Sequence, residues 1–267
     1  MENRTMELFA KTSFCTCSYI KKLRDHRASL VRSSIDSWDK FLELPFAERI
    51  FLDDGSPDVN GIRLLKSSKS INKFDEVRYN TLIHPPHSNF GIVYSMNICQ
   101  GEYILHLDDD INVTGSYQEC LNLLEKCLEI LEQDKNILGI NLLTMPKEFR
   151  QEWFPGEDYK DDFAHPQKYY GTAACLIRRE LLERVSLADI INWGAQQPNY
   201  WEVLVSDSAS SFLVSKVPTT FGLNLDAWVY QSVSQNNFRS LKKRFKYNLN
   251  KNFPFLKKFL SKGKKTT

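Results

Sequence analysis

The chain has 267 residues, 42% hydrophobic and 12% aromatic, which is the composition of a folded globular protein with room for one large α/β domain or two small ones. No stretch reaches the roughly 18–20 apolar residues of a membrane span, and the N-terminus lacks the apolar run of a signal peptide, so we expect a cytoplasmic protein. The net charge of +2 is unevenly distributed: 11 of the 35 basic residues follow Asp226, after which no acidic residue occurs. The first 226 residues contain the other 24 basic residues and all 33 acidic ones, so they carry a net charge of −9.

Strand and helix patterns alternate along the first 143 residues. Short runs rich in β-branched and aromatic residues predict strands at 13–19, 48–52, 78–83, 103–107 and 137–143. Apolar residues at helical spacing predict helices at 21–41, 89–100 and 116–134. This alternation is typical of the α/β class, so we expect a mostly parallel sheet flanked by helices.

The six cysteines are scattered, and no group of Cys and His residues has the spacing of a zinc site. We therefore expect free thiols that are buried or partly buried. His106 stands inside the predicted strand 103–107, and we expect a histidine packed in the core rather than a ligand.

Two acidic clusters follow predicted strands. The first, Asp53-Asp54-Gly55-Ser56-Pro57, ends the strand 48–52, and its Gly55 can take a positive φ in a turn. The second, Asp108-Asp109-Asp110, ends the strand 103–107. Ligands of open α/β sheets bind beyond the carboxyl ends of the strands, so both clusters are candidate binding residues.

Consecutive carboxylates raise one another's free energy unless a cation lies among them. Asp108 and Asp110, separated by one residue at a strand end, are suitable ligands for Mn²⁺ or Mg²⁺, which also bind phosphate oxygens. A metal held in this way neutralises the charge of a departing diphosphate. The alternative interpretation is a solvated acidic turn.

Four motifs occur in a defined order. They are Asp53-Asp54-Gly55-Ser56-x-Asp58, Asn89-x-Gly91, Gly101-Glu102-Tyr103-Ile104 and Asp108-Asp109-Asp110. This series resembles the GT-A glycosyltransferases of the family 2 type, which show a DDGSxD strand end, an N-x-G helix start, a G-E-Y-I strand and a DxD-type metal motif. The resemblance covers residues 13–112 well and is thinner beyond them. It implies a Rossmann-like GT-A fold.

The resemblance also implies roles for the matching residues. It implies a nucleotide-sugar site formed by Tyr19, Asp53, Asp54, Asn89, Asp108 and Asp109, and a Mn²⁺ or Mg²⁺ site formed by Asp110 and Asp108. Tyr19 would border the nucleotide base, and Asp53 or Asp54 would hydrogen-bond the base or the ribose. Simpler alternatives are that Tyr19 ends a strand and that Asn89 is a helix N-cap.

Residues 144–226 show less regular strand and helix patterns. Residues 169–179 predict a loop entering a strand, followed by a helix from Glu180, and the resemblance implies that this segment lies beneath the acceptor sugar. It also implies that Asp207 is the general base, which takes the proton from the acceptor hydroxyl so that the anomeric carbon is inverted. Glu202 is the second candidate, and the alternative role of Asp207 is a helix N-cap.

The tail at 227–267 is basic, and Leu241, Phe245 and Leu249 are four residues apart. Two short basic amphipathic helices hinged at Pro254 would lie on an anionic membrane surface. The alternative is that their apolar faces pack on the domain. We expect no nucleic acid as a partner, because the acidic body would repel a phosphate backbone.

The sequence therefore predicts one GT-A-like catalytic domain at 1–226, with a nucleotide-binding half (1–112) and an acceptor half (113–226), followed by the basic helical tail. We expect a metal-dependent, inverting, non-processive glycosyltransferase that moves a sugar from a nucleotide-diphosphate sugar to a glycan or lipid-linked acceptor, as in polysaccharide biosynthesis. It would act in the cytoplasm or peripherally on the inner face of the membrane. One alternative is a nucleotidyltransferase of related fold, although no glycine-rich phosphate loop follows the first strand. The other is an inactive scaffold domain.

Overall fold

The computed structural model describes residues 2–20, 27–57, 63, 65–80, 90–142, 163–164, 173–183, 212–215 and 221–223. The chain divides into two compact units, Met1–Leu223 and Asn224–Thr267, and all the described residues belong to the first unit. Three predicted site residues, Asn89, Glu202 and Asp207, lie outside the described residues, as does the basic tail.

Helices and strands alternate along the chain as the sequence predicts. The helices are α1 (Glu2–Phe9), α2 (Arg27–Ser37), α4 (Phe90–Asn97), α5 (Tyr117–Gln133) and α7 (Glu180–Glu183), with the 3-10 helices η2 (Phe41–Glu43) and η3 (Ile71–Lys73). The strands are β1 (Thr12–Ser18), β2 (Glu48–Asp53), β3 (Glu76–Tyr79), β4 (Tyr103–Leu107), β5 (Ile111–Val113), β6 (Gly139–Leu142), β7 (Phe163–Ala164), β8 (Ala174–Arg178), β9 (Phe212–Ser215) and β10 (Phe221–Leu223).

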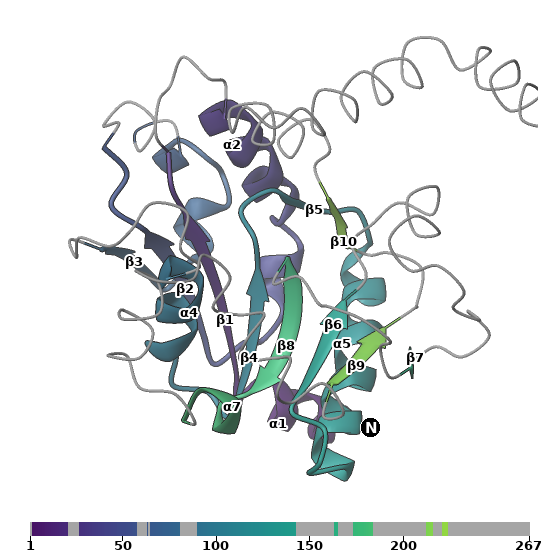
Figure 1. Ribbon diagram of the computed structural model, residues 1–267. Coiled ribbons are helices and arrows are strands. Elements are labelled where there is room, and N and C mark those ends of the chain that lie inside the picture. The colour runs from purple at the N-terminus through teal and green to yellow at the C-terminus, as the bar shows by residue number, and fades with distance from the viewer. Residues whose placement is uncertain are drawn as a thin grey trace, which may run out of the picture. The chain divides into compact units, whose positions relative to one another are not determined.

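The main sheet has eight strands in the order β3-β2-β1-β4-β8-β6-β9-β7 (Figure 1). Strands β3, β2, β1 and β4 are parallel, β8 is antiparallel to both β4 and β6, β6 is parallel to β9, and β7 is antiparallel to β9. Strands β5 and β10 form a second, antiparallel sheet. The predicted fold class, a mostly parallel sheet flanked by helices, is confirmed.

Two hydrophobic clusters cover the two faces of the main sheet. Helices α1, α2 and α5 pack on the face that carries Phe14 and Leu105, which we call the α2 face. Helices α4 and α7 pack on the face that carries Cys15 and Ile104, the α4 face. Successive side chains of a strand point to opposite faces, so neighbouring residues such as Phe14 and Cys15 enter different clusters.

Helix α1 has no counterpart among the predicted elements. It has only 8 residues, and a helix of that length is marginal in water without tertiary packing. Here Leu8 and Phe9 are buried in the cluster on the α2 face, which supplies that packing.

The predicted helix 21–41 is shorter in the structure. Residues 21–26 lie outside the described part, and α2 ends at Ser37. Trp38 is fully buried, and its Nε1–H donates to the carbonyl of Ile111 at 2.7 Å. This long-range contact holds the chain in a turn where the periodicity alone would continue the helix.

Two further local predictions, the helix 116–134 and the free cysteines, are confirmed. The structure adds a capping box at the start of α5, in which the side chains of Ser116 and Glu119 each accept a hydrogen bond from the other residue's backbone N–H. All six cysteines are free, and only Cys17 is not fully buried. Within the described part of the chain, no helix combines the length and the apolar character that crossing a membrane requires.

Candidate functional site

The two acidic clusters meet at one edge of the sheet. Strands β1, β2 and β4 are parallel neighbours, so their carboxyl ends lie side by side. Ser18 at the end of β1 pairs with Asp53 at the end of β2, and Asp108 directly follows β4. Burial raises the pKa of the Cys17 thiol on β1, and the charges of aspartates from both clusters raise it further. The predicted juxtaposition of the clusters is therefore present.

Asp53 has one satisfied and one unsatisfied carboxylate oxygen. Its Oδ1 accepts a hydrogen bond from the backbone N–H of Ser56 at 2.9 Å, within the turn where Gly55 has a φ of +76°. Its Oδ2 is buried and has no hydrogen-bond partner among the described residues. A buried acceptor without a donor costs free energy, so this oxygen is suited to accept an N–H or O–H group from a ligand.

Asp54 forms hydrogen bonds through both its backbone and its side chain. Its backbone N–H donates to the carbonyl of Ser18 at 2.9 Å, and its Oδ1 accepts from Asn80 Nδ2 at 2.8 Å. Helix α4 approaches so closely that a Cβ at Gly91 would lie 2.4 Å from Asp54 Cγ and 2.7 Å from Cys17 Sγ. The glycine of the Asn89-x-Gly91 motif is therefore required by the contact between α4 and Asp54.

Asp109, the middle aspartate, accepts hydrogen bonds at both oxygens. Ser18 Oγ donates to its Oδ2 at 2.7 Å, and Arg27 Nη2 donates to its Oδ1 at 2.6 Å. Although burial opposes it, the negative charges of Asp109 and Asp110 raise the pKa of Arg27, so the guanidinium stays charged. Arg27 is not among the predicted site residues, because the contact joins positions 82 residues apart.

Asp108 is held from the sheet. Its backbone N–H donates to the carbonyl of Ala173 at 2.8 Å, and its Oδ1 lies 3.0 Å from His106 Nε2. Its side chain is 27% exposed, whereas the other described aspartates of this edge, Asp53, Asp54, Asp109 and Asp110, are buried. His106 is fully buried, as predicted, but its contact with Asp108 was not predicted.

Asp110 has no matched positive charge among the described residues. Burial raises the pKa of its carboxyl to about 8, and the charges of Asp109 and Asp108 contribute to the rise. No described basic residue forms an ion pair with Asp110; Arg27 offsets the repulsion only in part. A cation bound beside Asp110 would stabilise its charged form.

A divalent metal ion fits these residues if the ligand completes its coordination. Among the described residues, no group of three or more His, Cys, Asp and Glu side chains is arranged to hold a metal ion. Mg²⁺ and chemically similar ions commonly bind one or two carboxylates and take phosphate oxygens and water as the other ligands. Asp108 and Asp110 are two carboxylates of this edge that can supply such a pair.

Tyr19 follows β1 at the same edge. Its side chain is 41% exposed, and the next backbone N–H, that of Ile20, donates to Ser56 Oγ at 2.8 Å. This bond joins the segment after β1 to the turn after β2. An aromatic ring therefore lies exposed next to the acidic turns, where a ring-stacking ligand can reach it.

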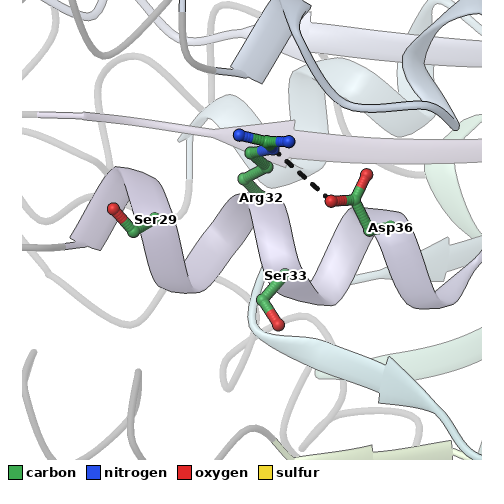
Figure 2. A pocket seen from close by; sticks show the side chains of 4 residues that line it. All are labelled: Ser29, Arg32, Ser33 and Asp36. Carbon is green, nitrogen blue, oxygen red and sulfur yellow. Dashed lines mark ion pairs between the residues drawn. The ribbon is translucent and has the colours of Figure 1, made fainter.

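A separate surface pocket of about 270 Å³ lies on α2 (Figure 2). The described residues that line it are Ser29, Arg32, Ser33 and Asp36. Arg32 Nε lies 3.4 Å from Asp36 Oδ2, and Asp36 Oδ1 accepts from Ser68 Oγ at 2.6 Å. Because these charges already have partners and none of the predicted site residues that the structure describes lines the pocket, we assign no ligand to it.

No protein-family model matches the chain, and no curated protein sequence matches it. Among solved structures, S. aureus TarS 1–349 in complex with UDP is similar to it, with a TM-score of 0.52 and 13% identity over 79% of this chain and 60% of TarS 1–349. The complex of TarS 1–349 with UDP-GlcNAc gives a TM-score of 0.51 and 14% identity over 79% and 58% of the two chains. The mannosyltransferase PcManGT from Pyrobaculum calidifontis, in complex with GDP-Man and Mn²⁺, gives a TM-score of 0.45 and 14% identity over 78% and 57%.

In each of these three comparisons the match spans less than two thirds of the solved chain. The likeness to TarS establishes the fold of this chain. It is the GT-A fold that the sequence motifs predict.

Proposed function

We propose that this protein is a glycosyltransferase that binds a nucleoside-diphosphate sugar at the carboxyl edge of β1, β2 and β4. The observation that carries the proposal is a pair of incompletely satisfied buried carboxylates at this edge. Among the described residues, Asp53 Oδ2 has no hydrogen-bond donor and Asp110 has no matched cation. A nucleoside diphosphate with a divalent ion supplies both the donor for Asp53 and the cation for Asp110. The complexes of TarS, which shares the fold, with UDP and UDP-GlcNAc support this ligand class.

The donor would be held by residues from both acidic turns. Asp53 Oδ2 accepts a hydrogen bond from the base or the ribose, and the exposed ring of Tyr19 borders the base. Asp54 and Asn89 complete the predicted nucleotide-sugar site. Asp108 and Asp110 hold Mn²⁺ or Mg²⁺, which when bound stabilises the diphosphate leaving group. Asp109, with both oxygens engaged by Ser18 and Arg27, contributes by ordering the turn between them.

The acceptor side of the proposal rests on the sequence. Asp207 is the proposed general base, with Glu202 as the second candidate, and reaction at the opposite face of the sugar gives inversion. The acceptor is a glycan or a lipid-linked sugar, used without processive extension. The basic tail at 227–267 would hold the enzyme against an anionic membrane surface on the cytoplasmic side.

Calorimetric titration of UDP, GDP and CDP, each with and without Mn²⁺, tests the proposal. We expect one nucleotide to bind in a Mn²⁺-dependent manner. Asp53→Asn should weaken this binding at least about tenfold, because a lost hydrogen bond to a charged group is worth about 1.5–3 kcal/mol. Glu7→Gln, on the exposed side of α1, is the matched control and should bind normally. If no nucleotide binds under either condition, the proposed donor is wrong.

The matching sugar nucleotide then separates the enzyme classes. Release of the nucleoside diphosphate with transfer of the sugar identifies a glycosyltransferase. Release of pyrophosphate from a nucleoside triphosphate would instead identify a nucleotidyltransferase. Binding without any turnover over a panel of glycan and lipid-linked acceptors would point to the inactive scaffold.

A further inference from the structure

His106 stands at an unusual place for a histidine. It is the only polar residue in Tyr103–Leu107 apart from the tyrosine hydroxyl, in a strand whose five residues are all buried. Its register partners on the neighbouring strands are Cys15 of β1 and Cys175 of β8. Burying an imidazole among thiols and aliphatic side chains costs free energy unless both ring nitrogens find partners.

Both ring nitrogens do find partners, and the partners define the proton positions. Nε2 lies 3.0 Å from Asp108 Oδ1, and a carboxylate can only accept, so Nε2 carries the hydrogen. In that tautomer Nδ1 is the acceptor, and it lies 3.7 Å from Cys15 Sγ, whose thiol can donate to it. Ser95 Oγ on α4, 3.8 Å from the same sulfur, continues the polar contacts into the helix. The imidazole is thus held in one orientation between the core and the acidic turn.

The contact with His106 affects the orientation of the Asp108 side chain. Residues 106 and 108 are two apart at the end of a strand, so their side chains leave the sheet on the same side, the α4 face. The contact of Oδ1 with His106 and the bond of the backbone N–H to the carbonyl of Ala173 restrain the orientation of the carboxylate. Its Oδ2 has no partner among the described residues, and the side chain is partly exposed at the edge.

We propose that His106 is a positioning residue that orients Asp108 for binding the donor or its metal ion. This inference rests on the proposed nucleotide-sugar site and adds to it a residue from the core of the sheet. Partners that orient a metal-binding side chain through a hydrogen bond typically change metal affinity or activity 10–100-fold when they are removed. A histidine that served only to fill the core would have no such effect on ligand affinity.

Three substitutions of His106 test the roles of its two ring nitrogens separately. His106→Gln keeps an N–H group near the Nε2 position and so keeps the bond to Asp108. His106→Asn keeps a polar group near the Nδ1 position, toward Cys15, but does not reach Asp108. His106→Leu removes both. We expect near-normal Mn²⁺-dependent nucleotide affinity for His106→Gln, and at least about tenfold weaker affinity for His106→Asn and His106→Leu, measured by calorimetry on the full chain.

Thermal unfolding of each variant shows whether it is folded before the titration. Equal affinity of folded His106→Gln and His106→Asn for the nucleotide that the wild type binds would overturn the inference and leave the proposed function standing. A wild type that binds no nucleotide would overturn both.

A second measurement needs no ligand and keeps the contact testable if the His106 variants do not fold. Long-range ¹H–¹⁵N correlation spectra of the histidine rings should give the Nε2–H tautomer for His106 in the wild type. Asp108→Ala, at a partly exposed position, should change that ring's ¹⁵N signals and leave those of the other four histidines in place. An unchanged His106 pattern would overturn the contact and the inference with it.

Discussion

Arg27 at the start of α2 places Nη2 2.6 Å from Oδ1 of Asp109, so the middle of three consecutive aspartates is neutralised from within the protein. The two side chains are only 17% and 6% exposed. The pair makes the acidic turn compatible with the folded state before any ligand arrives. It also leaves the two outer aspartates, Asp108 and Asp110, as the carboxylates available to a cation.

Replacing Arg27 with Gln should therefore destabilise the protein strongly. Breaking a buried ion pair by removing one partner costs about 3–5 kcal/mol, because the remaining charge is left uncompensated. Urea unfolding measures the loss. The double variant Arg27→Gln/Asp109→Asn should recover part of it, since both members of the ion pair are then replaced by neutral amides. A double variant whose loss is merely the sum of the single losses would contradict the pairing.

Asp109→Asn and Asp110→Asn should change stability in opposite directions. Asp109→Asn breaks the buried ion pair with Arg27, whereas Asp110→Asn removes a buried charge that repels its neighbours. In metal-free buffer at pH 8.5 we expect the first variant to unfold at a lower temperature than the wild type and the second at a higher one. Two variants that both lose stability would show that Asp110 has a stabilising partner.

The same Asp110→Asn variant should lose its response to metal. A ligand that binds only the folded state raises stability with its concentration, so Mn²⁺ with the bound nucleotide should raise the unfolding temperature of the wild type. Asp110→Asn should show little or no rise. An equal rise in both proteins would remove Asp110 as a metal ligand.

The direction in which Gly91→Ala changes the stability of the protein tests the close contact between α4 and Asp54. In an ordinary helix interior, alanine is more favourable than glycine by about 1 kcal/mol. At Gly91 the new Cβ would lie 2.4 Å from Asp54 Cγ, so Asp54 or α4 must move, and overpacking of this kind typically costs about 1–3 kcal/mol. We expect lower stability in urea unfolding and weaker nucleotide binding. A stabilised variant would contradict the close approach of α4 to Asp54.

Asp207→Asn should separate binding from transfer. A general base acts on the acceptor hydroxyl, so its loss leaves nucleotide affinity unchanged and lowers turnover by about 10²-fold or more. Glu202→Gln is the matched comparison. Normal turnover of Asp207→Asn together with inactive Glu202→Gln would transfer the role to Glu202.

Removal of the residues after Asn236 should release the protein from anionic vesicles. The removed segment carries 11 basic residues and no acidic one, and each basic residue near such a surface contributes about 1 kcal/mol. Co-sedimentation with vesicles containing phosphatidylserine measures binding, and vesicles of phosphatidylcholine alone are the control. Equal sedimentation with and without the segment would exclude the tail as the membrane contact.

Local sequence predicted the elements well where their own residues carry the pattern. The strand 103–107 and the helix 116–134 appear as β4 and α5 within a residue of the expected ends, because a short run of strand-forming residues and the helical spacing of apolar residues are short-range signals. Helix α1 and the early end of α2 were not predicted, because packing of Phe9 and the bond of Trp38 to Ile111 join distant parts of the chain. The antiparallel direction of β8 was likewise not encoded in its own residues.

The sequence alone determined which residues lie at the carboxyl edge of the sheet. They are two acidic turns, each placed after a strand, with the glycines that such turns and close contacts require. Only the tertiary structure decided what each carboxylate does. Asp108, Asp109 and Asp110 are chemically identical along the chain. They differ because His106 reaches the first from within the sheet and Arg27 reaches the second from α2, while no described cation pairs with the third. Such partners follow from strand order and helix placement, which bring together residues that the local pattern treats as unrelated.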